Sequence, residues 1–305
     1  TEGSLLCAWF GGTAEGGNDV GIWMSERRAP GWSAPVQRAK VVELAHWNPV
    51  LFRDGADRIH LFFKVGANTR DWQTWWMHRN GPGDWTMPVE LVPGDAGGRG
   101  PVKNKPILLH DGAWLAPAST EHRSSEPGRS RRPFADRSDD NGATWTRSED
   151  FPMADSLPGD GAIQPTFWES APGEVHALMR TGSGRLWRSD SADGGRTWTP
   201  VYATSIPNNN SGVDLVRLHD GRLLLVSNPV GIPFGFRNVL LLSVSTDDGL
   251  HWQPVARLEY SWNPFQEYSY PSIVPTGDGV AVSYTWKRER VRTWQIPASV
   301  LDEVS

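Results

Sequence analysis

The sequence has little cysteine and no long apolar run, the features of small disulfide-linked proteins and of membrane-spanning proteins. Its 305 residues include one cysteine, Cys7, which excludes an internal disulfide framework and a cysteine-rich zinc site. No apolar run approaches the ~18–20 residues that a membrane-crossing helix requires. No charged-then-apolar leader follows Thr1, as it would in a secretory signal segment. We therefore expect no membrane insertion, and a cytoplasmic location is favoured over a secreted one.

A strong charge of either sign is also missing. The chain has 30 Lys+Arg against 35 Asp+Glu, a formal net charge of −5. A weakly acidic chain has no broad attraction for nucleic acid or for an anionic membrane surface. We therefore expect no nucleic-acid partner, and the sequence carries no signal for a particular oligomeric state.

What the sequence does have is glycine, proline and tryptophan. Only 38% of the residues are hydrophobic, yet there are 32 Gly, 24 Pro and 17 Trp. Frequent glycine and proline turn the chain often, and tryptophan buries large rings. This mixture argues against a helical bundle and against disorder, and it favours an all-β protein.

One motif, Ser-x-Asp-x-Gly-x-x-Trp, occurs three times, at residues 138–145, 191–198 and 245–252. Two decayed copies, at residues 25–32 and 78–85, keep a turn and the final tryptophan. The five tryptophans stand at positions 32, 85, 145, 198 and 252, so the spacings are 53, 60, 53 and 54. Ser and Asp oxygens accept backbone N–H bonds in a tight turn, Gly supplies a positive φ, and Trp packs the turn against a sheet.

A period of about 53 residues with short strands is typical of a β-propeller with four-stranded antiparallel blades. Dividing the 305 residues by 53 gives about 5.8, which predicts six blades and one domain over residues 1–305. The Asp-rich motif could also bind calcium, but the 12-residue ligand spacing that ends in Glu is missing. We therefore expect no metal and no cofactor.

The blades can be phased from a second repeat. Innermost strands are expected at residues 48–51, 105–108, 164–167, 214–216 and 270–273, each followed by a turn and a second strand. The start of the first strand and the end of the second strand lie on one face, opposite the motif turns. The C-terminal run at residues 295–301 is expected to supply the first strand of the blade that begins at Ser4. An N-terminal extension is the alternative.

The repeated motif resembles the Asp box, or BNR repeat, of the sialidase (neuraminidase) superfamily. The runs at residues 8–23, 208–212 and 284–290 are also similar to sialidase-like proteins with BNR repeats. The resemblance covers nearly the whole chain and implies the sialidase fold, a six-bladed propeller. Sialidases hold the substrate carboxylate with three arginines, and they use a Tyr nucleophile and an acidic acid/base residue.

Carried over by motif position, the resemblance implies a catalytic set and a carboxylate-binding set. Tyr270 corresponds to the nucleophile, and Glu15, with Asp19 as second choice, corresponds to the acid/base residue. Arg180 and Arg237 correspond to the second and third arginines. Six further polar residues that phasing places on the same face are expected to bind substrate: Lys105, Gln164, His46, Asp214, Arg288 and Asn209.

The sequence departs from the family pattern at two points. The Arg-Ile-Pro motif of the first arginine is absent, and the only Ile-Pro in that register follows Gln295. Gln164 stands where a Glu would activate the tyrosine, and an unassisted phenol is a poor nucleophile. Asp214, Glu267 or Asp160 can substitute as the base, and Arg288 or Lys105 can supply the missing cation.

Three functions from different classes fit these residues. The first is a metal-independent exo-glycosidase of the sialidase-like kind that acts on a terminal sialic, ulosonic or uronic acid. The second is a uronate-specific polysaccharide lyase, in which Gln164 neutralises the carboxylate and a tyrosine or His46 removes the proton. The third is a non-catalytic carbohydrate-binding propeller that stacks sugars on tryptophans such as Trp72, Trp75, Trp114 and Trp168. All three imply an acidic carbohydrate as the partner.

Overall fold

The structure is a computed structural model that describes residues 4–28, 31–95, 97–121, 130–155 and 157–302. The described chain consists of β-strands and one short helix, α1 (Ala298–Asp302), and it divides into two compact units. The first unit holds the sheets of strands β1–β13, and the second holds those of β14–β24. Arg131, the first residue of β12, belongs to the second unit.

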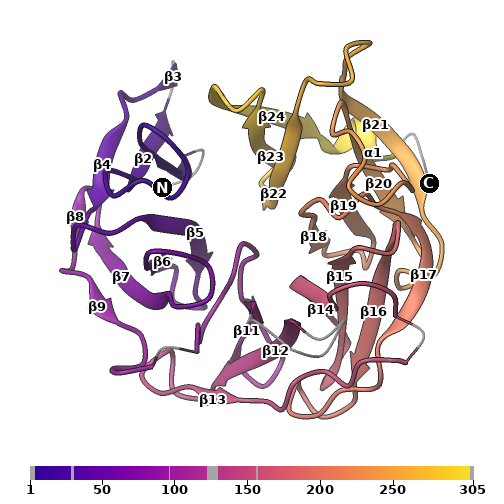
Figure 1. Cartoon of the computed structure of the whole chain (residues 1–305), viewed down its shortest axis with the longest axis horizontal. Coiled ribbons are helices and arrows are strands. Elements are labelled where there is room, and N and C mark those ends of the chain that lie inside the picture. Colours follow the sequence, from indigo (N-terminus) through magenta and orange to yellow (C-terminus); the bar gives the residue numbers. More distant parts are fainter. Residues whose placement is uncertain (1–3, 29–30, 96, 122–129, 156, 303–305) are drawn as a thin grey trace. The chain divides into compact units, whose positions relative to one another are not determined.

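The first unit contains three antiparallel sheets (Figure 1). The first comprises β1 (Leu5–Gly11), β2 (Gly21–Arg28), β3 (Gly31–Trp32) and β4 (Val36–Ala39). The second comprises β5 (His46–Arg53), β6 (Ile59–Val65), β7 (Gln73–Gly81), β8 (Asp84–Trp85) and β9 (Val89–Glu90). The third comprises β10 (Ile107–Leu108), β11 (Trp114–Glu121), β12 (Arg131–Ser138) and β13 (Thr146–Arg147).

The second unit also contains three antiparallel sheets. The fourth sheet comprises β14 (Ala162–Ala171), β15 (Glu174–Thr181), β16 (Arg185–Ser191) and β17 (Tyr202–Pro207). The fifth comprises β18 (Asp214–Arg217), β19 (Leu223–Ser227), β20 (Val239–Ser245) and β21 (Gln253–Tyr260). The sixth comprises β22 (Tyr268–Thr276), β23 (Gly279–Trp286) and β24 (Arg290–Pro297). Six sheets in chain order match the predicted blade count.

The predicted innermost strands correspond to β5, β10, β14, β18 and β22, so the phasing is confirmed. The prediction for the C-terminal run is wrong. Residues Gln295, Ile296 and Pro297 pair with Ala281, Val280 and Gly279, as the end of strand β24, and helix α1 follows. The run continues the alternating pattern that begins at Arg290, so it pairs with the strand immediately before it in a local hairpin rather than with a distant segment.

The three complete motif turns have the hydrogen bonds that the sequence predicts. In each, the Ser hydroxyl donates to the Asp carboxylate and accepts from the Gly N–H, and the Trp indole donates to the Gly carbonyl. Gly142 has φ 88°, and a Cβ there would lie 2.5 Å from the ring of Trp114. The turns lie between the third and fourth strands of their sheets.

Tryptophan burial explains much of the unusual composition. Trp114 and Trp168 are fully buried, and Trp72 is nearly so. Trp198 stacks on Phe151 and Phe167, with ring centroids 4.2 and 5.2 Å away. These rings fill the space within and between neighbouring sheets, so Trp72, Trp114 and Trp168 are packing residues and not sugar-stacking platforms.

Three innermost strands share a proline-associated bulge. Asn48, Gln164 and Tyr270 each precede a proline, each has a positive φ of 44°, 53° or 51°, and each lies at a register shift. Proline cannot donate to the ladder, and an extra residue in one strand re-aims a side chain. A left-handed non-glycine residue before proline is strained, and such strain concentrates at functional sites. Two of these three residues belong to the predicted site.

Candidate functional site: an arginine pair around Tyr270

Arg180 lies near the end of β15 and is the most buried cation of the predicted site. Its side chain donates from Nε to Asn210 Oδ1 at 3.0 Å and from Nη1 to Gln164 Oε1 at 3.1 Å. Both acceptors are neutral amides, and Arg180 forms no ion pair with a carboxylate among the residues that the structure describes. Burial lowers the pKa of Arg180, and the charges of Arg237 and Arg131 lower it further, against the opposing effect of Tyr270. A buried guanidinium with neutral partners favours an anionic ligand.

Arg237 lies at the end of the loop between β19 and β20 and is held by Glu267. Its Nη1 donates to Glu267 Oε1 at 3.0 Å, and Ser269 Oγ donates to the same oxygen at 2.5 Å. Arg288 Nη1 lies 3.6 Å from the other carboxylate oxygen, Oε2. Burial by itself raises the pKa of Glu267, but Ser269 and the two arginines lower it below its usual range. Glu267 is therefore an ionised anchor for Arg237.

Tyr270 lies in β22 close to both of these cations. The Cζ atom of Arg180 is 5.9 Å from the centroid of its ring, and that of Arg237 is 5.4 Å away. Its side chain is partly exposed, at 38%, whereas Gln164 and Arg180 are buried. The second unit thus brings together Tyr270, Arg180, Arg237 and Gln164 with a route to solvent at the tyrosine. Arg288 joins them through Glu267.

Arg131 is a cation that sequence reasoning missed. The structure places it at the start of β12, where its N–H donates to Asp160 O at 2.8 Å. It pairs in parallel with Gly161, three residues before Gln164. Its charge contributes to the lowered pKa of Arg180. A long-range bridge of this kind has no sequence signal.

Two predicted substrate-binding residues have structural contacts. Asp214 is buried, accepts from Thr166 Oγ1 at 3.2 Å and accepts from the Ile273 N–H at 2.9 Å. Asn209 is buried, and its Nδ2 donates to the carbonyls of Gly235 and Phe236 at 3.0 and 2.7 Å. Asp214 joins three strands, and Asn209 fixes the loop that precedes Arg237.

Four predicted site residues lie in the first unit. Glu15 is exposed in a turn, and Lys105 is half-buried before β10. Asp19 accepts from the N–H and hydroxyl of Thr13, which lower its pKa, the wrong direction for a proton donor. His46 is buried, its Nε2 accepts from the Val41 N–H, its Nδ1 bonds Leu44 O, and burial lowers its pKa. These contacts support a structural role for His46.

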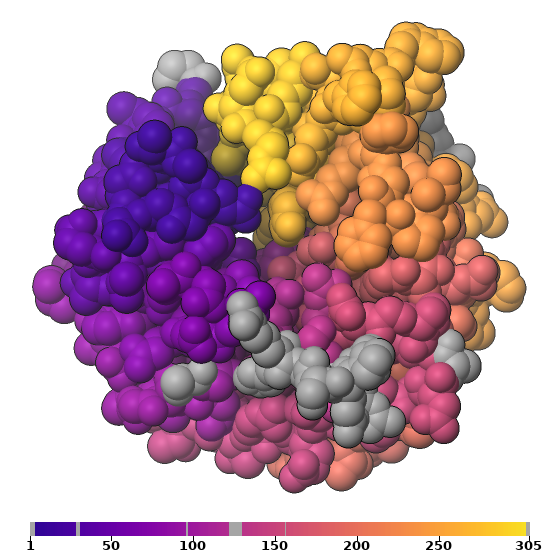
Figure 2. All heavy atoms as spheres, in the orientation of Figure 1, coloured from indigo at the N-terminus to yellow at the C-terminus, as the bar shows by residue number. Residues whose placement is uncertain are grey.

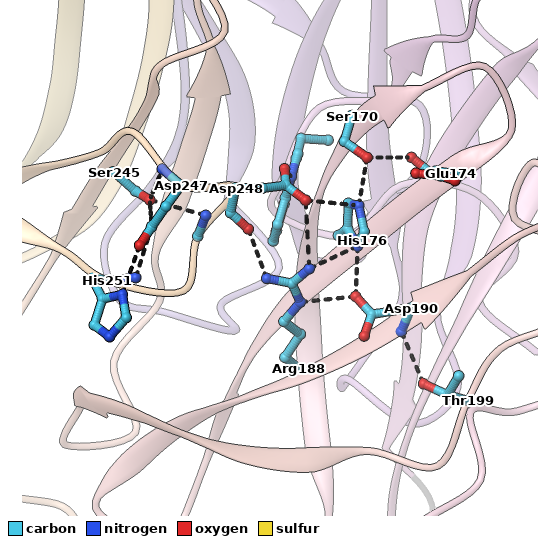
Figure 3. Close-up of polar contacts among 12 residues, drawn as sticks. Ser170, Glu174, His176, Arg188, Asp190, Thr199, Ser245, Asp247, Asp248 and His251 are labelled. Carbon is cyan, nitrogen blue, oxygen red and sulfur yellow. Dashed lines mark hydrogen bonds and ion pairs between the residues drawn. The ribbon is translucent and has the colours of Figure 1, made fainter.

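A second polar cluster lies at the opposite end of the fourth sheet, on the motif-turn side (Figure 3). His176 Nδ1 is 2.6 Å from Asp190 Oδ1, and its Nε2 is 2.8 Å from Ser170 Oγ. This order is that of a hydrolase triad, but Asp248 Oδ2 also lies 3.2 Å from Nε2, so that nitrogen is not reserved for the serine proton.

The same cluster ties two sheets together. Arg188 Nη1 donates to the Asp248 carbonyl at 2.8 Å, and Trp168 Nε1 donates to the Asp248 carboxylate at 2.7 Å. Burial by itself raises the pKa of Asp190, but hydrogen bonds from His176, Arg188 and Tyr202 lower it to about 2. The cluster therefore joins the fourth sheet to the motif turn of the fifth.

Among the described residues, no group of three or more His, Cys, Asp and Glu side chains is arranged to hold a metal ion. No described helix is long and apolar enough to cross a membrane.

Solved structures that match this fold include sialidases and a protein of unknown function. NanB sialidase from Streptococcus pneumoniae matches with a TM-score of 0.71 at 14% identity, covering 93% of this chain and 63% of NanB. The leech intramolecular trans-sialidase matches with a TM-score of 0.70 at 15% identity, covering 99% of this chain and 67% of that enzyme. A protein of unknown function from Dyadobacter fermentans matches with a TM-score of 0.72 at 16% identity, covering 93% and 87%.

These likenesses define the class: the chain has the sialidase-like fold, an all-β six-bladed β-propeller, as predicted. Residues 3–283 match the family described as BNR repeat-like domain, and the chain belongs to that family. No curated protein matches the chain. The chain spans less than two thirds of the length of NanB.

Proposed function

We propose that the chain is a glycosidase that removes a terminal acidic sugar, a sialic, ulosonic or uronic acid, from a carbohydrate. The observation that carries this proposal is the arginine pair beside Tyr270, with Cζ atoms 5.9 and 5.4 Å from the ring centroid. Guanidinium groups bind carboxylates through paired hydrogen bonds. Arg180 has only neutral side-chain partners among the described residues, so a substrate carboxylate would be its first counter-charge.

In the proposed reaction, the sugar carboxylate binds Arg180 and Arg237. The phenol of Tyr270 passes its proton to a base, a role for which the sequence offers Asp214, Glu267 or Asp160. Its oxygen bonds to the anomeric carbon as the bond to the leaving oxygen breaks, and the leaving oxygen takes a proton from an acid. The resemblance to sialidases assigns that role to Glu15. Water then displaces the tyrosine: one proton of the water returns to Glu15, and the departing phenolate takes back its own proton from the base. The nearby guanidinium groups stabilise negative charge that develops on the phenol oxygen.

Release of a fluorescent aglycone from a 4-methylumbelliferyl sialoside tests this proposal. Tyr270→Phe is expected to lower kcat at least ~100-fold, whereas Tyr268→Phe, a buried tyrosine two residues away, keeps activity. Arg180→Ala is expected to raise KM about tenfold or more for acidic sugars and not for neutral ones. Unchanged turnover in Tyr270→Phe would contradict the assignment.

A second candidate is a carbohydrate-binding propeller without turnover. The observation that favours it is the engagement of Glu267 by Arg237 and Ser269, together with Gln164 in place of a carboxylate beside Arg180. Titration calorimetry with an acidic sugar that shows binding without release of an aglycone would support this candidate. Ultraviolet absorbance that grows on a uronate polymer would instead identify a lyase. Because both ring nitrogens of His46 bond the backbone, a tyrosine is the better candidate for its base.

A further inference from the structure

The end of the second unit that carries the arginine pair also exposes a group of apolar side chains. Five residues, here called the apolar patch, lie in the loops between β19 and β20 and between β21 and β22: Ile232, Phe234, Phe236, Trp262 and Phe265. Their exposed fractions are 68%, 71%, 52%, 90% and 83%. Orange segments of this unit form part of the surface seen in Figure 2. A cluster of large apolar side chains that stays exposed marks an interaction site.

The backbone of the first loop is firmly held although its side chains are exposed. Asn209 Nδ2 donates to the carbonyls of Gly235 and Phe236, and the Phe234 N–H donates to Asn209 O at 3.2 Å. Gly235 N donates to Ile232 O at 2.9 Å. The patch is therefore presented on a fixed support, which reduces the entropy lost when a ligand binds.

The second loop is joined to the first. Ser261 N donates to Asn238 O at 2.9 Å, and Tyr268 N donates to Arg237 O at 2.8 Å. The rings of Phe236 and Phe265 meet edge to face, with centroids 5.7 Å apart and an interplanar angle of 81°. The two loops therefore form one surface and not two separate tips.

The patch is continuous with the arginine pair. Phe236 directly precedes Arg237, and Phe265 lies two residues before Glu267. A Cβ built on Gly182 would lie 3.7 Å from Phe234 Cε2, so this ring lies over the chain two residues beyond Arg180. A ligand whose carboxylate is held by the arginines can therefore extend over the patch.

The chemistry of the patch selects the kind of group that covers it. Residues 229–236 read PVGIPFGF and contain no polar side chain. The hydroxyls of a neutral sugar need hydrogen-bond partners when they lose water, and this loop offers none from its side chains. An apolar group gains from leaving water and needs no such partners.

We infer that the apolar patch is a subsite for an aryl or acyl aglycone, so that the substrate is an acidic sugar joined to an apolar group. This inference rests on the proposed function, because the acidic sugar positions the aglycone. The patch raises affinity for the conjugate, and the arginine pair supplies selectivity for its carboxylate.

Matched glycosides test the subsite. Two acidic sugars are used, N-acetylneuraminic acid and glucuronic acid, each as its methyl and its 4-nitrophenyl glycoside. Each glycoside is titrated into the whole chain and into three variants, Phe236→Ala, Phe265→Ala and Met87→Ala. Met87 is an exposed apolar residue of the first unit, 81% accessible, and serves as the control. The wild type is expected to bind a nitrophenyl glycoside about tenfold more tightly than its methyl partner. Each Phe variant is expected to lose most of that preference, and Met87→Ala to keep it.

The outcomes separate the two proposals. Equal binding of methyl and nitrophenyl glycosides by the wild type, or a preference that both Phe variants retain, would overturn the subsite and leave the acidic-sugar site intact. Failure of every acidic glycoside to bind would contradict the proposed function itself. Sedimentation velocity tests whether a second copy of the chain binds the patch instead. A wild-type dimer that becomes monomeric in Phe265→Ala would assign the patch to that second copy and overturn the subsite.

Discussion

Arg180 is a buried cation with two side-chain hydrogen-bond acceptors that carry no negative charge. Gln164 and Asn210 accept its hydrogen bonds through neutral amide oxygens, so the buried charge keeps its attraction for an external anion. Gln164 is a departure from the sialidase pattern, and its effect is to leave Arg180 without a carboxylate at that contact. A single atom change at residue 164 therefore controls the electrostatics of the site.

Gln164→Glu is expected to weaken binding of an acidic sugar about tenfold. The new carboxylate would stand about where Oε1 now accepts from Arg180 Nη1 at 3.1 Å, and it would neutralise the cation before the ligand arrives. Gln253→Glu adds the same charge at an exposed position of β21 and is the control. Calorimetric titration measures both. Affinity that is unchanged in Gln164→Glu would show that Arg180 does not hold the carboxylate.

The sequence pattern places some residues of the candidate site, but it cannot place those whose neighbours come from distant segments. The positions of Arg180 and Tyr270 follow from the repeat, at the end of a second strand and the start of a first, and their roles stay predictions. Arg131 was missed because its approach to Arg180 depends on a bridge to Gly161 that joins distant segments. Asp214 was placed in the correct strand, but its contacts with Thr166 and Ile273 come from neighbouring sheets.

Among the structural elements, the motif turns are the most regular. In the turn of the fourth sheet, Asp193 Oδ1 accepts from the N–H groups of Arg196 and Thr197 at 3.0 and 2.8 Å, and from Ser191 Oγ at 2.8 Å. Trp198 then closes the turn against Gly195 O at 3.0 Å. The turn lies at the end of the sheet opposite Arg180, so it affects stability and not ligand binding.

Asp193→Ala is expected to lower the free energy of unfolding by about 1–3 kcal/mol, because several donors lose their acceptor. Arg196→Ala, which truncates an exposed side chain of the same turn, is expected to stay within about 0.5 kcal/mol of the wild type. Urea unfolding measures both values, and affinity for an acidic sugar should not change. A loss of affinity without a loss of stability would place this turn in the site.

The order of the elements was largely readable from the sequence. Asp-Gly turns and the motif spacing fixed the sheets, the phase of the strands and the side on which the motif turns lie. The pairing at the end of the chain could not be predicted. The run at residues 295–301 has the alternation of a strand, but nothing in the sequence indicates which strand it pairs with. It pairs with β23 and then turns into α1, since a local hairpin costs less entropy than a distant closure.

Across the second unit as a whole, one buried carboxylate connects three sheets. Asp214 belongs to β18, receives the Thr166 hydroxyl from β14 and receives the Ile273 N–H from β22. These buried contacts support a structural role for Asp214, and the site role that the sequence indicated for it stays a prediction. The cohesion of the unit near its innermost strands depends on this residue.

Asp214→Ala is expected to lower the free energy of unfolding by about 3 kcal/mol, because buried donors on two strands lose their partner. Asp220→Ala, at an exposed turn after the same strand, removes a surface pair with Arg222 and is expected to cost about 1 kcal/mol or less. Chemical denaturation compares them. Full stability together with lost affinity in Asp214→Ala would return Asp214 to the binding site.

The bulges at Asn48, Gln164 and Tyr270 have a consequence for how such a protein can change its chemistry. At each, the strained backbone is fixed by the following proline and by the strands around it, while the side chain is not needed for the ladder. At these three positions, one side chain can therefore be exchanged for another without moving the sheet. A library that varies only positions 164 and 270 would explore new ligands and reactions on an unchanged scaffold. Glycine, asparagine and aspartate would be the least strained choices at both.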